Sequence, residues 1–377
     1  MKITGAGSMR IMLSCLFSGL LLAACGGSGT GQGTLVTSLA DSFTEEYKAV
    51  YVTIDHVEVH LGGNEEEDGN WKIVAEPGGT YNLLDLVNGV RETLGITTLS
   101  ADIYTQMRLI IGTEPGRGYP YANFAVDAND DLHPLKVPGG PQTGLKIVEG
   151  FEILADETTE LILDFDAMRS VVKAGSSGQY LLKPTVSVLD ISEGAVVSGS
   201  VTDGPDLLEG ARVMAQTADS TAGDPKDEVT IHAGTVSSPY GSYALFLSSG
   251  SYNLVVGREG YLPACEPVDL TAGENVTINF GLTPAGSGTG TISGSVGIAD
   301  LGEDQYATID FRQEIACGGI DQVVTVKSIN VADGYSYSIA LPAGDYLAVG
   351  WTYGEAAMVF DVTVNSGSET VDVDFIF

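Results

Sequence analysis

Basic residues are scarce in this chain. Its 377 residues include 17 Lys and Arg against 50 Asp and Glu, which gives a formal net charge of −33 at pH 7. A surface this acidic repels nucleic acids and anionic lipid head groups, and it attracts cations. The composition therefore argues against a nucleic-acid partner and favours a solvated acidic exterior.

The sequence also lacks the common motifs of catalytic and nucleotide-binding sites. It has no G-x-x-x-x-G-K-S/T phosphate loop, no H-E-x-x-H zinc motif and no G-x-S-x-G nucleophile elbow. A zinc peptidase needs a cluster of ligands, and no H-x-x-E pair is present. The histidines are His56, His60, His133 and His232. We therefore predict a protein that is not an enzyme and needs no cofactor.

The N-terminal apolar run is too short to span a bilayer as a helix, which takes about 20 residues. Residues 11–24 are mostly apolar and follow the positive charges of Lys2 and Arg10. A charged start followed by a short apolar segment is typical of a secretory signal peptide. We assign residues 1–24 to such a signal.

A cysteine stands directly after this run. Leu22-Ala23-Ala24-Cys25 resembles the lipobox of bacterial lipoproteins, which implies cleavage before Cys25 and acylation of its thiol and amino group. Stable anchoring takes at least two lipid chains, and a triacylated cysteine meets that condition. Residues 25–33 would then be the lipidated cysteine and a Gly-rich tether that reaches roughly 15 Å. By analogy with the enterobacterial sorting rule, Gly26 favours the outer membrane, on its periplasmic or surface face.

Strand patterns dominate the rest of the chain. Apolar residues alternate from Val50 to Ile54, and the phase flips before Val57, which predicts a strand with a bulge near residues 55–56. One segment, "YNLLDLVNGVRETLG" at residues 81–95, has the spacing of a short helix that ends at glycine. These patterns predict an all-β protein with one short helix.

The first half of the chain resembles the domain of unknown function 4382, found in exported bacterial and archaeal proteins. The resemblance implies a mainly β domain on an exported chain and no established activity. Its blocks occur in the expected order: "VYVTIDHVEVH", "LLDLVNG", "YTQMRLII", "LDFDAMRSVV" and "YLLKPTVSV".

The second half repeats itself. Tyr243 and Tyr252 recur as Tyr337 and Tyr346, both 94 positions later, within similar blocks. The first copy resembles carboxypeptidase regulatory-like domains, which are transthyretin-like sandwiches and usually accessory or surface modules. The segments that carry this resemblance are Ser198-Gly199-Ser200-Val201, Gly210-Ala211-Arg212-Val213, Gly241–Tyr243, Gly250–Tyr252 and Gly260-Tyr261.

We therefore expect three β-sandwich-type domains in tandem. The first domain covers residues 34–192, and the second covers residues 193–283. A Gly/Ser-rich linker at residues 284–290 precedes the third domain, a divergent copy at residues 291–377.

Three oxygen-bearing side chains suggest a calcium site. Asp127, Asn129 and Asp131 stand at alternate positions, and hard oxygen ligands suit calcium. The glycine and the distant glutamate of an EF-hand are missing, so the alternative is an ordinary Asp/Asn turn.

Two strand faces carry groups that could do chemistry. His56, Glu58 and His60 share one face of a regular strand and could bind a metal. Asp164 and Asp166 flank Phe165 and could act as an acid and a base. The alternatives are polar strand faces, with an aspartate facing water or Arg169.

Cys265 and Cys317 remain after cleavage and lipidation. An exported protein can form disulfides, and a bond between these two would contribute on the order of 4 kcal/mol in the loop-entropy model. Two separately buried thiols are the alternative.

Together these features indicate a non-enzymatic, lipid-anchored cell-envelope protein that acts in binding, adhesion or scaffolding, with a glycan or an envelope protein as partner. One alternative is a carbohydrate-binding lipoprotein, which needs exposed aromatic residues. The candidates are Trp71, Tyr119, Tyr121 and Trp351. The other alternative is a hydrolase with an unrecognised site in the first domain, which a pocket holding the two aspartates would favour.

Overall fold

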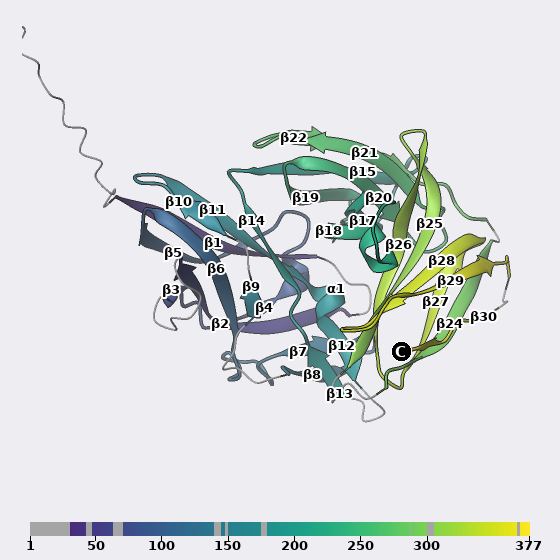
Figure 1. Ribbon diagram of the computed structural model, residues 1–377, viewed down its shortest axis with the longest axis horizontal. Coiled ribbons are helices and arrows are strands. Elements are labelled where there is room, and N and C mark those ends of the chain that lie inside the picture. The colour runs from purple at the N-terminus through teal and green to yellow at the C-terminus, as the bar shows by residue number, and fades with distance from the viewer. Residues whose placement is uncertain are drawn as a thin grey trace, which may run out of the picture.

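The computed structural model describes residues 31–42, 47–62, 71–138, 145–147, 150–174, 179–286, 288–299, 305–367 and 370–377. Within these ranges the chain forms three β domains that lie against one another, the first and third at opposite ends (Figure 1). The signal segment and Cys25 lie outside the described residues. No helix in the described ranges is long and apolar enough to cross a membrane.

The first domain packs a four-stranded sheet, ordered β14-β11-β1-β5, against a ten-stranded one, ordered β10-β6-β2-β7-β8-β13-β12 with β3, β4 and β9 at its sides. Its elements are β1 (Gln32–Ser42), β2 (Ala49–Leu61), β3 (Trp71–Ala75), β4 (Gly79–Asn82), η1 (Leu83–Asp85), β5 (Glu92–Ser100), β6 (Asp102–Ile111), β7 (Phe124–Val126), β8 (Leu132–Lys136), β9 (Leu145–Ile147), β10 (Phe151–Ile153), β11 (Thr158–Asp166), α1 (Ala167–Ser170), β12 (Val171–Ala174), β13 (Gln179–Leu182) and β14 (Val186–Asp190).

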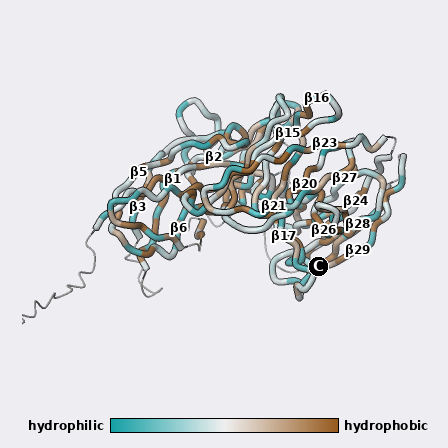
Figure 2. The backbone as a smooth tube through the Cα atoms, turned by 90° about the horizontal axis from the view of Figure 1, so that it is seen from above, coloured by the Kyte–Doolittle hydropathy of each residue, from teal (hydrophilic) through white to brown (hydrophobic). Residues whose placement is uncertain are grey.

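The core of the first domain is built from the alternating apolar side chains that the sequence predicted. Leu161, Leu163 and Phe165 of β11 are fully buried between the two sheets, because successive side chains of a strand point to opposite faces. Apolar and hydrophilic residues alternate in the same way along other strands (Figure 2). The register of β2 against β6 shifts between Ile54 and His56, so the predicted bulge is confirmed.

The prediction of a helix at residues 81–95 is wrong. The segment continues from β4 into a 3-10 turn of three residues, η1, and then into β5. Asn88 and Gly89 both have positive φ, 59° and 77°, a conformation that ends any right-handed helix. Pairing of β4 with β2 and of β5 with β1 prevails over the weak local helix pattern.

The second domain is a sandwich of two sheets. One sheet centres on β15 and the other has the order β18-β17-β20-β21. The elements are β15 (Gly194–Asp203), β16 (Asp206–Leu207), β17 (Arg212–Ala218), η2 (Pro225–Glu228), β18 (Val229–Val236), β19 (Ser242–Ser248), β20 (Gly250–Gly257), β21 (Ala264–Leu270), β22 (Asn275–Thr277) and β23 (Phe280–Gly281).

The third domain repeats this arrangement, with β24 at the centre of one sheet and the order β26-β25-β28-β29 in the other. The predicted repeat of strand order is confirmed. The elements are β24 (Thr289–Gly297), β25 (Tyr306–Cys317), β26 (Ile320–Ala332), β27 (Ser336–Pro342), β28 (Gly344–Trp351), β29 (Met358–Val364), β30 (Thr370–Asp372) and β31 (Phe375–Ile376).

The repeated residues make the same contacts in both copies. The hydroxyl of Tyr243 donates to the carbonyl of Ile278 at 2.7 Å, and that of Tyr337 donates to Val373 at 2.6 Å. A Cβ at Gly199 would lie 1.7 Å from the Ile278 oxygen. The equivalent Gly294 meets Val373 at 1.8 Å. Glycine is therefore required where each tyrosine ties two strands together.

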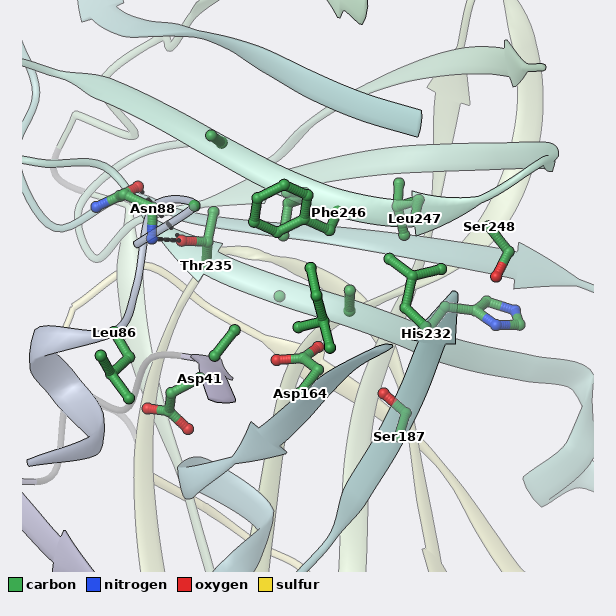
Figure 3. A pocket seen from close by; sticks show the side chains of 18 of the residues that line it. Asp41, Leu86, Asn88, Asp164, Ser187, His232, Thr235, Phe246, Leu247 and Ser248 are labelled. Carbon is green, nitrogen blue, oxygen red and sulfur yellow. Dashed lines mark hydrogen bonds between the residues drawn. The ribbon is translucent and has the colours of Figure 1, made fainter. Parts of the chain in front are cut away.

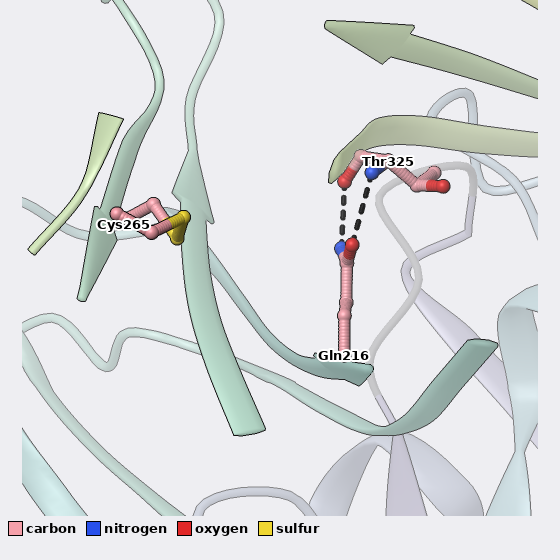
Figure 4. Close-up of a disulfide and its surroundings, with 4 residues drawn as sticks. Gln216, Cys265 and Thr325 are labelled. Atoms are coloured by element: carbon pink, nitrogen blue, oxygen red, sulfur yellow. Dashed lines mark hydrogen bonds between the residues drawn. A yellow bond between two sulfur atoms is a disulfide. The ribbon is translucent and has the colours of Figure 1, made fainter. Parts of the chain in front are cut away.

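The second and third domains are joined through their sheets. The parallel pairing of β21 with β25 links their strands into one eight-stranded sheet. Nearby, the buried Gln216 side chain pairs with the backbone of Thr325 like a neighbouring strand (Figure 4). Its amide donates to the Thr325 carbonyl at 2.7 Å and accepts from the Thr325 N–H at 2.9 Å.

The first domain contacts both of the others. An apolar cluster that includes Ile162 and Phe246 joins it to the second domain. Another cluster, with Val172 and Ala332, joins it to the third. Each of the three domains therefore packs against both of the others, so they are not separate units joined only by linkers.

Cys265 and Cys317 form a disulfide across the β21–β25 contact (Figure 4). Replacing both residues with Ser is expected to lower the free energy of unfolding by about 2–4 kcal/mol, because the crosslink restricts the unfolded chain. Urea denaturation of the oxidised protein, the reduced protein and the double variant measures this. Coincident midpoints for the oxidised wild type and the double variant would contradict it.

Candidate functional site

A cavity of about 260 Å³ lies between the first and second domains. β1, β11 and β14 form one wall, and β18 and β19 form the other (Figure 3). Apolar side chains such as Phe246 line it together with polar groups, among them Ser187 and Thr235. Thr235 also accepts a hydrogen bond from the backbone N–H of Asn88 at 3.2 Å, which closes one end.

Asp164 is the titratable group that β11 directs to this cavity. Leu163 and Phe165 on either side point into the core of the first domain, so the carboxyl of Asp164 must point the other way. Asp164 is partly solvent-accessible, and its accessible side lines the cavity instead of facing bulk water. Burial, and secondarily the charge of Asp166, raise its pKa to about 7, and Arg169 opposes this shift.

Two other titratable groups of the cavity, Asp41 and His232, have structural partners. An oxygen of Asp41 accepts the backbone N–H of Ala167 at 3.0 Å. His232 lies 2.9 Å from the Thr217 hydroxyl, and burial, then Arg169, lower its pKa. The cavity thus offers one carboxyl group that is neutral and able to donate a hydrogen bond below pH 7, and charged above it.

The structure separates the two aspartates considered as an acid–base pair. Asp166 is not part of the cavity lining. It caps α1 by accepting the N–H of Arg169 at 2.9 Å, and it also forms an ion pair with the Arg169 side chain. The predicted pairing with Arg169 therefore holds for Asp166, whereas Asp164 is covered by the second domain.

The predicted calcium ligands form a turn between β7 and β8. Asp127 accepts the N–H groups of Asn129 at 2.8 Å and Asp131 at 3.0 Å, and its other oxygen lies 3.0 Å from His133. The His133 contact first, and the Asp131 N–H next, lower the pKa of Asp127. Among the described residues no group of three His, Cys, Asp or Glu could hold a metal ion. The geometry is that of an Asp/Asn turn, and calcium binding stays a prediction.

The His56 face of β2 is occupied by internal contacts. The ring nitrogens of His56 lie 2.7 Å from Asp55 and 3.3 Å from Glu58. His60 is buried beside Trp71, and the Arg108 guanidinium stacks on that indole at 3.8 Å. The three predicted residues do share a region of the sheet, but all three are engaged in internal contacts: His56 with Glu58, and His60 with the ring of Trp71.

Sequence reasoning missed the buried polar groups between the second and third domains. Gln216, Asp310 and Arg312 are at most 3% exposed. Gln216 and Asp310 each interrupt an apolar stretch of their strand, and that interruption is the signal that the sequence offers, whereas Arg312 stands in a mostly polar run. A polar residue there is equally compatible with a solvent-facing strand position, so the signal does not identify an interface.

Family models match two parts of the chain. Residues 32–184 match the domain of unknown function DUF4382. Residues 196–283 match the carboxypeptidase regulatory-like domain, so both predicted resemblances are confirmed. No curated protein matches the chain.

Solved structures that match the chain include the Bacillus anthracis TIE protein, at 13% identity over 92% of this chain with a TM-score of 0.20. The chain spans only 50% of that protein. A streptococcal ancillary pilin matches at 11% identity over 91% of this chain and 99% of its own, with a TM-score of 0.21. The shaft pilin SpaA of Lactobacillus rhamnosus GG matches at 11% identity over 48% of this chain and 97% of its own, with a TM-score of 0.20. Scores this low carry no argument about function.

Proposed function

We propose that the protein is a non-enzymatic, lipid-anchored module of the cell envelope whose three domains form one rigid platform for binding or scaffolding. The packing of each domain on both others supports this most directly. Tandem domains that move independently bury little surface between them. Here, however, buried polar groups, two apolar clusters and a disulfide connect the domains.

The anchor rests on the lipobox-like motif that ends at Cys25. Residue 32 already belongs to β1, so only a short Gly-rich segment would separate a lipid on Cys25 from the folded platform. Such a tether keeps the first domain within a few tens of ångströms of the membrane at most. We propose the outer membrane as its location.

Replacing Cys25 with Ala is expected to move the protein from the membrane fraction to the soluble fraction, because the lipid supplies the membrane affinity. Fractionation of cells expressing wild type and variant measures this. Cys15→Ala, within the proposed signal, is the matched control and should leave fractionation unchanged. Mass spectrometry that finds an unacylated mature wild-type protein would contradict the anchor.

A second candidate function is carbohydrate binding, which an aromatic cluster on the first domain favours. Tyr119 and Tyr121 are 37% and 42% exposed. Their rings lie 5.3 Å from Tyr51 and 6.2 Å from Phe124, respectively, and these two supporting rings stack on each other at 4.5 Å. Fixed, partly exposed rings suit stacking on the apolar face of a sugar.

Replacing Tyr119 and Tyr121 together with Ala is expected to weaken glycan binding by about tenfold or more, since each ring contributes roughly 1 kcal/mol. A glycan array screened with the full chain, followed by titration of the best hit, measures this. Tyr353→Ala removes a ring that is 91% exposed on the third domain and should bind like wild type. Equal loss in both variants, or no array hit, would refute this second function.

A further inference from the structure

A second cavity, of about 280 Å³, lies between the second and third domains. The second domain contributes the start of β17 and the turn after β20, and the third contributes β26 and β27. Gly257 lies at the end of β20, beside Arg212 and Val326 of the lining. The cavity is separate from the one that holds Asp164.

The lining of this cavity carries a net positive charge, opposite in sign to the net charge of the whole protein. Arg212, Arg258 and Lys327 line it with a single carboxylate, that of Glu259. The whole chain has about three acidic residues for each basic one. An average stretch of its surface should therefore carry a net negative charge, whereas the net charge of this lining is positive.

The cationic groups are held in place by their surroundings. Arg212 is only 9% exposed and donates from Nη2 to the carbonyl of Val326 at 3.3 Å. The guanidinium of Arg258 lies 5.8 Å from the ring centre of Tyr261, whose hydroxyl donates to Asp203 at 3.2 Å. Lys327 approaches from β26 of the other domain.

We propose that this cavity binds a small organic oxyanion, one that carries a carboxylate or a phosphate group. Guanidinium groups bind such oxyanions with paired, charge-assisted hydrogen bonds, and an ammonium group adds a further point charge. The site goes beyond the envelope-platform role and does not depend on the anchor.

Isothermal titration of the full chain in low salt tests the site, with inorganic phosphate and glucuronate as probes and glucose as the neutral counterpart. We expect saturable binding of at least one anion and none of glucose. Arg258→Gln and Lys327→Gln should each weaken binding by about tenfold or more. Glu259→Gln should tighten it, because it removes the one repulsive charge.

Lys72→Gln is the matched control: it makes the same charge change on β3 of the first domain and should bind like wild type. Binding of only one of the two anions supports the site and identifies the group it prefers. Absence of saturable binding of both anions to wild type overturns the proposal. So does unchanged binding in both cavity variants, provided that their melting curves match wild type.

Discussion

Replacing Asp164 with Asn is expected to stabilise the protein by up to about 4 kcal/mol at pH 8 and to change its stability little at pH 4. The carboxyl has a pKa of about 7 in the fold, against an ordinary value of 3.8. Between these values the folded state holds a proton that the unfolded state has lost. Wild-type stability therefore falls as pH rises from about 4 to about 7, and asparagine removes that loss.

Urea denaturation at pH 4, 6 and 8 measures the difference between variant and wild type, so that other titrating groups cancel. Asp166→Ala is the contrasting variant, because it removes the cap of α1 and the ion pair with Arg169. It should destabilise the protein at pH 6, and less at pH 8, where loss of the Asp166 charge also relieves the repulsion of an ionised Asp164. If Asp164→Asn leaves the pH dependence unchanged, the carboxyl does not carry the proton assigned to it.

The same residue marks the limit of what the sequence predicts. Strand alternation placed Leu163 and Phe165 in the core and Asp164 on the opposite face, and the structure agrees. The pattern is local, so it cannot tell water from a second domain on that face. The cavity around Asp164, and the raised pKa of its carboxyl, arise from packing between segments that are far apart in the sequence, such as β1, β11 and β19.

The repeat was predictable because it needs no tertiary information: two similar stretches of one chain fold alike. The true structure of residues 81–95 was not predictable in this way, because the apolar spacing that suggested a helix extends over only one or two turns. Pairing of the neighbouring strands overrode it, and Asn88 adopts a positive φ that few residues other than glycine accept. The candidate anion site is equally invisible, because Arg258 and Lys327 come together only when β20 and β26 pack.

Replacing Arg312 with Met is expected to lower the free energy of unfolding by about 3–5 kcal/mol, the typical cost of leaving a buried charge without its partner. Arg312 is fully buried and lies 3.1 Å from Asp310, itself only 3% exposed. Its guanidinium also donates to the carbonyls of Pro225 and Lys226, at 2.6 and 3.2 Å. The variant therefore removes from Asp310 the guanidinium that pairs with it, leaving the Thr325 hydroxyl as a donor, and it removes the Arg312 hydrogen bonds to η2.

A double variant, Arg312→Met with Asp310→Leu, separates these effects. Removing both charges should recover part of the loss, because no buried charge then lacks a partner. Arg91→Met is the exposed control, because the ion pair of Arg91 with Glu160, at 3.4 Å, is partly solvated. This substitution should lower the free energy of unfolding by no more than about 1 kcal/mol.

The shape of the urea transition carries further information, because Arg312 connects the second and third domains directly. If the domains act as one platform, wild type unfolds in a single transition, and Arg312→Met should separate it into two or broaden it. Hydrogen exchange at the backbone N–H groups of residues 226–228 should rise in the variant, because η2 has lost the Arg312 hydrogen bonds to its carbonyls. A single, unshifted transition together with unchanged exchange would show that these contacts do not hold the domains together.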